Sequence, residues 1–410
     1  MARWCNTLII SSLIAVGFPG SANAGTSDMI DALKAQVSAL TERIAQLEAQ
    51  VIENAQRSAA VTTESIQPET SSSKGSSSAS GWFDTVKLKG DFRYRHEAFD
   101  IENRRDRHRQ RMRARAQITG QVSDSVSAVL GLASGGSDPI STNQTFDDAS
   151  SSKGVVIDLA YATWKTPVEG LKVSAGKMKN PFHRAGGNGL VWDGDLNPEG
   201  IAMSFAANGL LANALYSWLD ESSSDDDSFL VGTQIGVRKA ISETGALTAG
   251  AGYFHYFDSR GEPAFFDGSA AGNQLDAMGN YINGFEIAEL FLEYTVSVSD
   301  GQLTLFGDVV RNLDADRYED GFAVGAKFKQ GALSAGYTYQ ELEPNAVLGT
   351  FSDSDFIGGG TDGKGHIIQA GYAISKRISL KGTLFLNDRN VDLGMEEEFK
   401  RLMLDISFKY

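Results

Sequence analysis

The chain has 410 residues and a formal net charge of −15, an acidic balance that argues against a general nucleic-acid-binding protein. Its single cysteine, Cys5, excludes a disulfide framework and a thiolate metal site. Beyond residue 24 no stretch holds about 18 consecutive apolar residues, which excludes transmembrane helices but leaves transmembrane strands open.

Residues 1–24 predict a secretory signal peptide. Arg3 provides a positive start, residues 8–16 form a short apolar core, and Ala22, Asn23 and Ala24 make a small-residue cleavage site. Cys5 lies ahead of the apolar core and not at the cleavage site, which disfavours a lipid-anchored form.

Residues 25–57 predict a coiled coil in the periplasm. Seven apolar residues recur at alternating spacings of three and four, the heptad pattern of helices that pack against one another. They are Ile30, Leu33, Val37, Leu40, Ile44, Leu47 and Val51. A lone amphipathic helix is the alternative interpretation. Residues 58–81 are rich in Ser and Gly and predict a flexible linker.

From residue 82 to residue 410 the sequence alternates as β-strands do, and the first two strands show why a membrane barrel is expected. Each has one apolar and one charged face. The basic residues of the charged faces are Lys87, Lys89, Arg93, Arg95, Arg109, Arg111, Arg113 and Arg115. An arginine facing lipid at the bilayer centre would cost about 2–4 kcal/mol, so these faces are predicted to point into a lumen.

The alternation predicts sixteen strands, with fourteen or eighteen as alternatives. Their ranges are 86–98, 108–119, 124–134, 154–165, 171–178, 199–207, 210–219, 229–241, 245–257, 285–298, 301–312, 319–330, 331–341, 365–375, 376–388 and 399–410. Short and long connections alternate, as an up-and-down membrane barrel requires, and an even count places both ends at the periplasmic edge. Sixteen strands enclose a lumen wide enough for an aqueous channel.

The last strand places Leu404, Ile406, Phe408 and Tyr410 on one face and ends on an aromatic residue. This ending resembles the C-terminal strand of bacterial outer-membrane proteins. The resemblance implies that these residues form an insertion signal and that the barrel-assembly machinery is a partner.

Adjacent strands lie about 4.8 Å apart, so the basic residues of the first two strands are predicted to form one positive wall inside the pore. Such a wall sets ion selectivity. In the alternative interpretation, luminal acids such as Asp91, Glu97 and Asp405 pair with these cations and neutralise them.

The stretches LKGDFRYRHE, GKMKNPF and WDGDLNPEG resemble the Putative porin family, in which a coiled coil precedes an outer-membrane barrel. The chain is also similar to phosphate-selective porins, where luminal arginines guide anions. The resemblance implies that the third long connection folds inward and narrows the pore, with loop 258–284 as the alternative. The candidate constriction residues are Lys179, His183, Arg184, Asp193, Asp195 and Glu199.

The resemblance also implies a homotrimer, whereas the heptad pattern itself favours two-stranded pairing. We therefore expect an all-β protein, a 16-stranded antiparallel transmembrane β-barrel preceded by a short coiled-coil helix. It is expected to be integral to the bacterial outer membrane, in contact with lipid and lipopolysaccharide.

The expected function is a porin for passive diffusion of small hydrophilic solutes and ions. The alternatives are a selective anion or phosphate channel, and a barrel whose coiled coil tethers the outer membrane to the cell wall. The five histidines show no metal-ligand spacing and no catalytic or nucleotide-binding motif appears, so no enzyme activity, metal or cofactor is expected.

Overall fold

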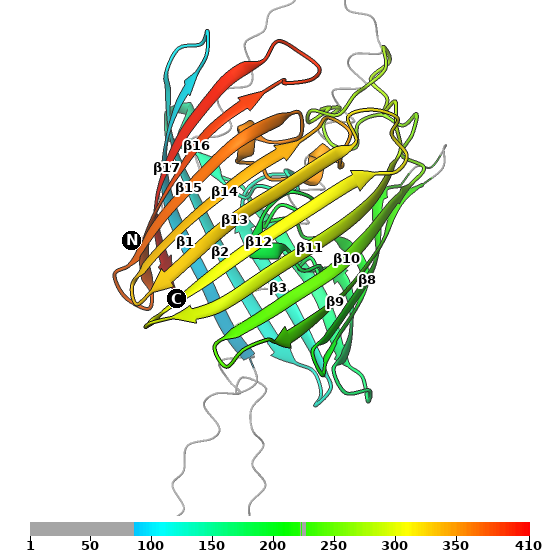
Figure 1. Ribbon diagram of the computed structural model, residues 1–410, viewed down its shortest axis with the longest axis vertical. Coiled ribbons are helices and arrows are strands. Elements are labelled where there is room, and N and C mark those ends of the chain that lie inside the picture. Colours follow the sequence, from blue (N-terminus) through cyan, green and yellow to red (C-terminus); the bar gives the residue numbers. More distant parts are fainter. Residues whose placement is uncertain (1–85, 222, 224–226) are drawn as a thin grey trace, which may run out of the picture. The chain divides into compact units, whose positions relative to one another are not determined.

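A computed structural model describes residues 86–221, 223 and 227–410, which form one closed antiparallel β-barrel (Figure 1). The barrel closes because β1 (Val86–Ile101) pairs with both β2 (Arg107–Gln121) and β17 (Glu397–Lys409). The predicted signal peptide, coiled coil and linker lie outside the described residues. Within the described part, no helix is long and apolar enough to cross a membrane.

Sixteen long strands build the wall of the described barrel, each at the place that the alternation predicts. The others are β3 (Val126–Ser134), β5 (Val155–Lys165), β6 (Leu171–Lys177), β7 (Glu199–Ala207), β8 (Leu210–Asp220), β9 (Ser228–Ala240), β10 (Gly245–Phe257), β11 (Phe285–Val298), β12 (Gly301–Asn312), β13 (Asp320–Gln330), β14 (Leu333–Leu342), β15 (Gly363–Ala373) and β16 (Ile378–Arg389). A two-residue strand, β4 (Gln144–Thr145), pairs with β2 beyond the end of β3. The sixteen-stranded antiparallel barrel is thereby confirmed.

Connections at the two edges of the barrel differ in length. At one edge β7 and β8 are joined by Asn208 and Gly209 alone, both with positive φ, as a tight hairpin turn requires. The opposite edge carries the long connections. Four of them matter below: the second loop (135–154), the third loop (178–198), the fifth loop (258–284) and the seventh loop (343–362).

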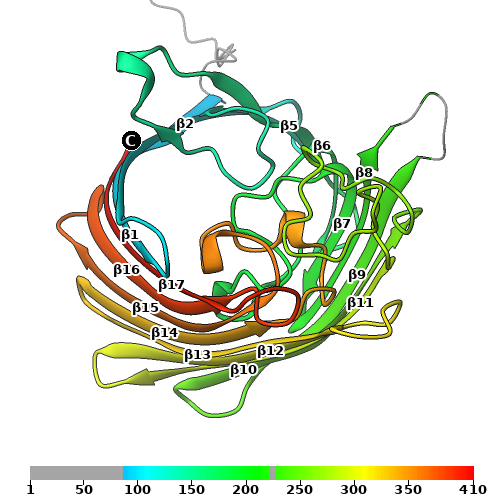
Figure 2. The same cartoon turned by 90° about the horizontal axis from the view of Figure 1, so that it is seen from above.

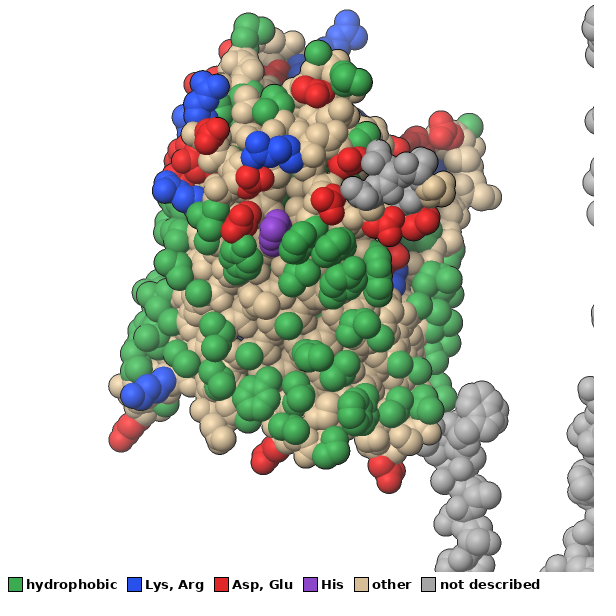
Figure 3. Space-filling view, turned by 90° about the vertical axis from the view of Figure 1, so that its right-hand side faces the viewer, with side chains coloured by type: hydrophobic (Ala, Val, Ile, Leu, Met, Phe, Trp, Pro, Cys, Tyr) green, Lys and Arg blue, Asp and Glu red, His purple; other side chains and the backbone are tan. Residues whose placement is uncertain are grey.

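The outer face of the barrel is apolar. Exposed side chains such as Leu88, Ile201, Leu290 and Leu404 share the outward parity of their strands. Figure 3 shows hydrophobic side chains spread over the wall, with acidic and basic side chains gathered toward the edge that bears the long loops. This distribution matches a wall that faces lipid between two polar boundaries.

The interior of the barrel holds an apolar cluster, which the sequence did not predict. Segments of the third, fifth and seventh loops lie inside the wall (Figure 2). Trp192 of the third loop stacks on Phe182 with ring centroids 5.6 Å apart and meets Phe254 of β10 edge-on at 5.0 Å. Tyr281 of the fifth loop and Leu348 of the seventh loop belong to the same buried cluster. The loops therefore fill the lumen beside β7 to β13, and the open space lies toward β1, β2 and β14 to β17.

Candidate functional site

Four cavities that share lining residues follow the unfilled side of the lumen. The outer cavity, about 610 Å³, lies among the long loops. The middle cavity, about 280 Å³, shares Ser354 with it and lies between the third and seventh loops and the wall. Two inner cavities, of about 460 and 600 Å³, reach the short-turn edge and share Lys327 and Arg113, respectively, with the middle cavity.

The middle cavity has the smallest volume of these four spaces and is lined by charged side chains. Six cations face four carboxylates there. The cations are Arg93, Arg95, Arg113, Arg184, Lys327 and Lys381, and the carboxylates are Asp193, Asp195, Asp353 and Asp355. The cations come from strands and the third loop, whereas all four acids come from the two loops, so charges of opposite sign face one another across the opening.

Arg113 and Arg115 of β2 hold the third loop against the wall. Both guanidiniums lie 3.1 Å from Asp195 of that loop. On the wall itself they also pair with Asp91 of β1, at 3.2 and 2.9 Å. The two arginines thus project into the lumen, and their charge is shared between two carboxylates.

Further toward the loop edge, Arg95 and Arg401 hold the seventh loop. Arg95 pairs through two nitrogens with Asp405 of β17, at 2.7 and 2.9 Å, and lies 3.2 Å from Asp355. Arg401 lies 3.0 Å from Asp355 and, like Arg109, pairs with the buried Glu97. Burial alone would raise the pKa of Asp355, but the Arg401 and Arg95 guanidiniums outweigh it and hold that pKa below its usual range.

A second group of luminal cations has no such partner. Within the described residues, Arg111, Arg184, Lys327 and Lys381 form no ion pair with a carboxylate. Arg184 donates to the carbonyl of Trp192 at 3.0 Å, and Lys327 to that of Gly186. Arg111 donates to the carbonyl of Asn143 at 3.3 Å, and its Nε is buried without a partner. These four residues leave uncompensated positive charge along the path.

The third and seventh loops are fastened to each other by Asp193, a contact that we call the loop latch. The Asp193 carboxylate accepts the backbone N–H of Asp195 at 2.7 Å and that of Ser354 at 2.9 Å. Its own N–H donates to the carbonyl of Phe351 at 2.8 Å, and the N–H of Asp353 donates to that of Gly189 at 3.0 Å. Burial, followed by the nearby charge of Asp353, raises the pKa of Asp193 to about 7.

A pair of buried acids holds the tip of the third loop. Gln234 of β9 donates to Glu289 at 2.8 Å, and Asn188 of the loop donates to Asp308 at 2.7 Å. The backbone of His183 also exchanges hydrogen bonds with Gln234, at 2.7 and 2.9 Å. The N–H of Gly186 donates to Glu293 of β11 at 2.7 Å, so the tip is bonded to β9, β11 and β12.

The Putative porin family matches residues 100–280 and 305–410. The chain belongs to this family. The fold and the family together make it an outer-membrane porin, a channel and not an enzyme.

Solved structures share the fold of this porin. Salmonella typhi OmpF, in complex with daunomycin, matches with a TM-score of 0.51 and 12% identity over 80% of this chain and 99% of that chain. A loop L8 deletion mutant of OmpT from Vibrio cholerae matches with a TM-score of 0.47 and 16% identity, over 80% and 99%. No curated protein matches the sequence.

Most of the predicted constriction residues lie beside the lumen of this porin. Lys179 bonds to Asn197 at 2.8 Å and lines an inner cavity with Asp195. His183 is half-buried, with Nε2 3.8 Å from Glu293. Glu199 lies elsewhere: it begins β7 with the outward parity of Ile201 and pairs with Lys177 at 2.9 Å. The strand begins at Glu199, as the predicted range 199–207 already has it, and the alternation of β7 turns this side chain away from the lumen.

The remaining predicted residues lie toward the short-turn edge. Lys87 and Lys89 are exposed near the start of β1, and Lys89 lines an inner cavity. Leu404, Phe408 and Tyr410 point outward from the last strand. The described residues contain no group of three or more histidine, cysteine, aspartate or glutamate side chains placed to hold a metal ion.

Several luminal residues were not predicted. Lys327 and Lys381 share inward parity with neighbours in their strands, so the alternation contained the signal that could have found them. Asp353 and Asp355 lie in the seventh loop, where no periodic pattern marks which side chains face the pore.

Proposed function

We propose that this outer-membrane porin is a passive diffusion channel for small hydrophilic solutes and that it favours anions. The observation that carries the proposal is the surplus of unpaired luminal cations, Arg111, Arg184, Lys327 and Lys381, along these cavities. Fixed charges that line a pore raise the local concentration of ions of the opposite sign.

The distribution of charge supports this preference more strongly than the net charge opposes it. The whole chain carries −15. The inner cavity beside β13 and β16 is nevertheless lined by Lys327, Lys329 and Lys381, with no acid among its described lining residues. Charges outside the pore are screened by salt within about 8–10 Å, so the luminal cations decide what a permeating ion meets.

Selective transport of phosphate is a narrower form of the same proposal. Arg95, Arg113 and Arg115 already pair with carboxylates, which leaves fewer guanidiniums to grip a phosphate strongly. We therefore favour broad anion preference over phosphate specificity. If phosphate permeates far better than chloride, phosphate specificity is favoured over broad anion preference.

A liposome swelling assay tests the proposal. The porin should admit gluconate faster than a cationic sugar of similar size, such as glucosamine. The double substitution Lys327→Gln and Lys381→Gln should reduce that ratio by about half or more. Lys400→Gln is the matched control, because Lys400 pairs with Glu398 on the outer parity of β17. Equal rates for the two solutes would overturn anion preference, and no swelling would overturn the channel itself.

The homotrimer, the coiled-coil assembly and the cell-wall tether remain proposals of the same kind. Deletion of residues 25–80 separates them. If the oligomer collapses, the segment assembles the porin. If the oligomer and the conductance persist while envelope attachment fails, the segment is an anchor.

A further inference from the structure

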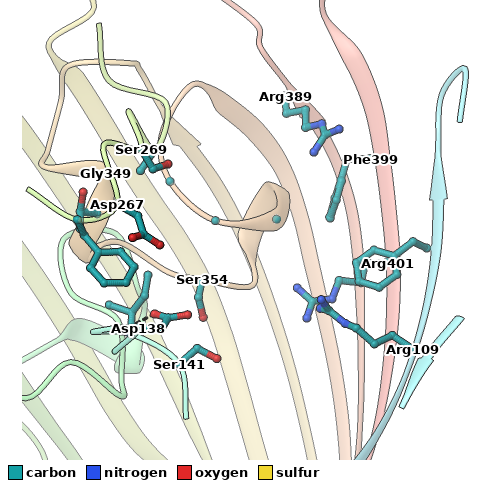
Figure 4. A pocket seen from close by; sticks show the side chains of 18 of the residues that line it. Arg109, Asp138, Ser141, Asp267, Ser269, Gly349, Ser354, Arg389, Phe399 and Arg401 are labelled. Atoms are coloured by element: carbon teal, nitrogen blue, oxygen red, sulfur yellow. Dashed lines mark hydrogen bonds between the residues drawn. The ribbon is translucent and has the colours of Figure 1, made fainter. Parts of the chain in front are cut away.

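The outer cavity has two chemically different walls. Figure 4 shows Arg109, Arg389, Phe399 and Arg401 on one side of the space. Asp138, Ser141, Asp267, Ser269 and Ser354 lie on the other side, on the second, fifth and seventh loops. The second wall therefore adds carboxylates and hydroxyls to the cavity beside its cations.

The basic wall is built on aromatic rings. The guanidiniums of Arg107, Arg109 and Arg401 lie 5.8, 5.1 and 5.0 Å from the centre of the Phe99 ring. Arg389 lies 5.3 Å from that of Phe399. Stacking against a ring fixes the plane of a guanidinium while its N–H edges stay available. The wall is therefore a set of preoriented donors and not a group of mobile charges.

Among the arginines that line the cavity, Arg107 and Arg111 pair with no carboxylate within the described residues, whereas the others do. Glu97 pairs with Arg109 and Arg401, and Glu397 pairs with Arg389. Arg111 has no carboxylate partner within the described residues, and its buried Nε lacks any hydrogen bond. A buried charged donor without a partner costs free energy unless a ligand supplies the acceptor. Arg111 is thus the point at which an incoming carboxylate would bind most favourably.

The opposite wall offers acceptors and hydroxyls. Asp138 accepts the backbone N–H of Ile140 at 3.0 Å through Oδ1. The hydroxyls of Ser141 and Ser354 and the carboxylate of Asp267 line the same space. Carboxylate oxygens and hydroxyls together accept and donate hydrogen bonds as the hydroxyls of a sugar ring do.

We propose that the outer cavity is a binding site for sugar acids. The carboxylate of the solute binds Arg111, which lines the same cavity as the stacked arginines, and its hydroxyls bind Asp138 and the serines. A cavity of about 610 Å³ has room for a monosaccharide or disaccharide. The inference rests on the proposed diffusion function, because it assigns a preferred solute to the same pore.

A zwitterion such as an amino acid is the competing ligand, with its ammonium group beside Asp138 and Asp267. The composition of the cavity favours the sugar acid. Six arginines line it against these two acids, so a ligand of net negative charge gains more than a neutral one. The wall that carries the two acids also presents more hydroxyls than carboxylates.

Isothermal titration calorimetry on the folded, detergent-solubilised porin tests the site. Glucuronate should bind at least about tenfold more tightly than glucose, which lacks the carboxylate, or acetate, which lacks the hydroxyls. Glycine serves as the zwitterion. Equal affinities for glucuronate and acetate, or tightest binding of glycine, would overturn the proposal.

Two substitutions separate the two walls. Arg111→Gln should weaken glucuronate and acetate alike, by about tenfold. This substitution removes no ion-pair partner from a carboxylate, so the barrel should stay intact. Heat-modifiable migration of the protein on a gel would verify that the barrel is folded. Asp138→Asn should weaken glucuronate several-fold and leave acetate unchanged. Arg260→Gln is the control, because Arg260 pairs with Asp314 at 2.7 Å outside the cavity. Glucuronate affinity that neither substitution changes would contradict the site.

Planar-bilayer recording distinguishes failure of the site from failure of the channel. Glucuronate added on the loop side should interrupt the current in wild type, and Arg111→Gln should shorten the interruptions. Anion conductance without glucuronate binding would overturn the site and leave the proposed function standing. Glucuronate binding without any conductance would support the site and contradict the diffusion channel.

Discussion

Glu97 shows how single residues hold this lumen together. Its carboxylate is fully buried and pairs with both Arg109 and Arg401. Glu97→Ala would leave Arg109 without a carboxylate and Arg401 with Asp355 alone, and removing one partner of a buried ion pair costs about 3–5 kcal/mol. We expect a clear fall in the urea midpoint for unfolding from lipid vesicles. Glu199→Ala, at an exposed pair, should change stability by about 1 kcal/mol or less. Equal effects of the two substitutions would contradict the network.

The loop latch predicts a pH dependence. The pKa of Asp193 is raised to about 7 in the folded protein, first by burial and then by Asp353, whereas its unfolded value is 3.8. A carboxyl with a raised pKa favours folding while protonated, so its contribution is present below pH 4 and is lost as the pH rises to 7. The latch should therefore be tighter at low pH.

Hydrogen exchange of the third and seventh loops measures this effect. Amides of residues 189–195 and 351–355 should be better protected at pH 5 than at pH 8, after correction for the intrinsic rate. Asp353→Asn removes the neighbouring charge and should reduce the difference. Greater protection of these amides at pH 8 than at pH 5 would contradict the raised pKa of Asp193.

At the scale of elements, the third loop is held inside the barrel by packing as well as by charge. Trp192 is buried between Phe182 and Phe254. Trp192→Ala should destabilise the loop by about 3–5 kcal/mol and raise the single-channel conductance, since a loosened loop obstructs less of the lumen. Trp218→Ala, on the exposed outer face, should leave the conductance unchanged. A wild-type conductance in Trp192→Ala would show that the loop does not restrict the pore.

The sequence predicted the strands well because alternation reports directly which face of a wall meets lipid. The opposed Arg93 and Arg113, and Asp91 and Arg115, follow from the parity of β1 and β2 once the two strands pair. The luminal apolar cluster could not be predicted in this way. Leu190, Val191 and Trp192 stand in an irregular loop, where a short apolar run carries no information about which surface it covers.

The sequence predicted some of the carboxylate partners of the luminal arginines and missed others. Asp91, Glu97 and Asp405 are the acids that the alternative interpretation pairs with the luminal cations, and each pairs with arginines in the structure. The sequence does not predict Asp355 as a partner. This loop residue is separated from Arg95 by 260 positions, and no local pattern joins the two. Pairing between loops and strands depends on the closed barrel, which sets which distant residues meet.

At the scale of the whole molecule, the acidic chain encloses a pore whose lining carries more basic than acidic side chains. This contrast between the net charge of the chain and the charge of its lumen predicts an anion-selective channel. The reversal potential of a planar bilayer in a KCl gradient tests it most directly. The porin should show a reversal potential of the sign produced by chloride permeation, and Arg111→Glu with Arg113→Glu should shift it toward potassium. A cation-selective wild-type channel would contradict the account.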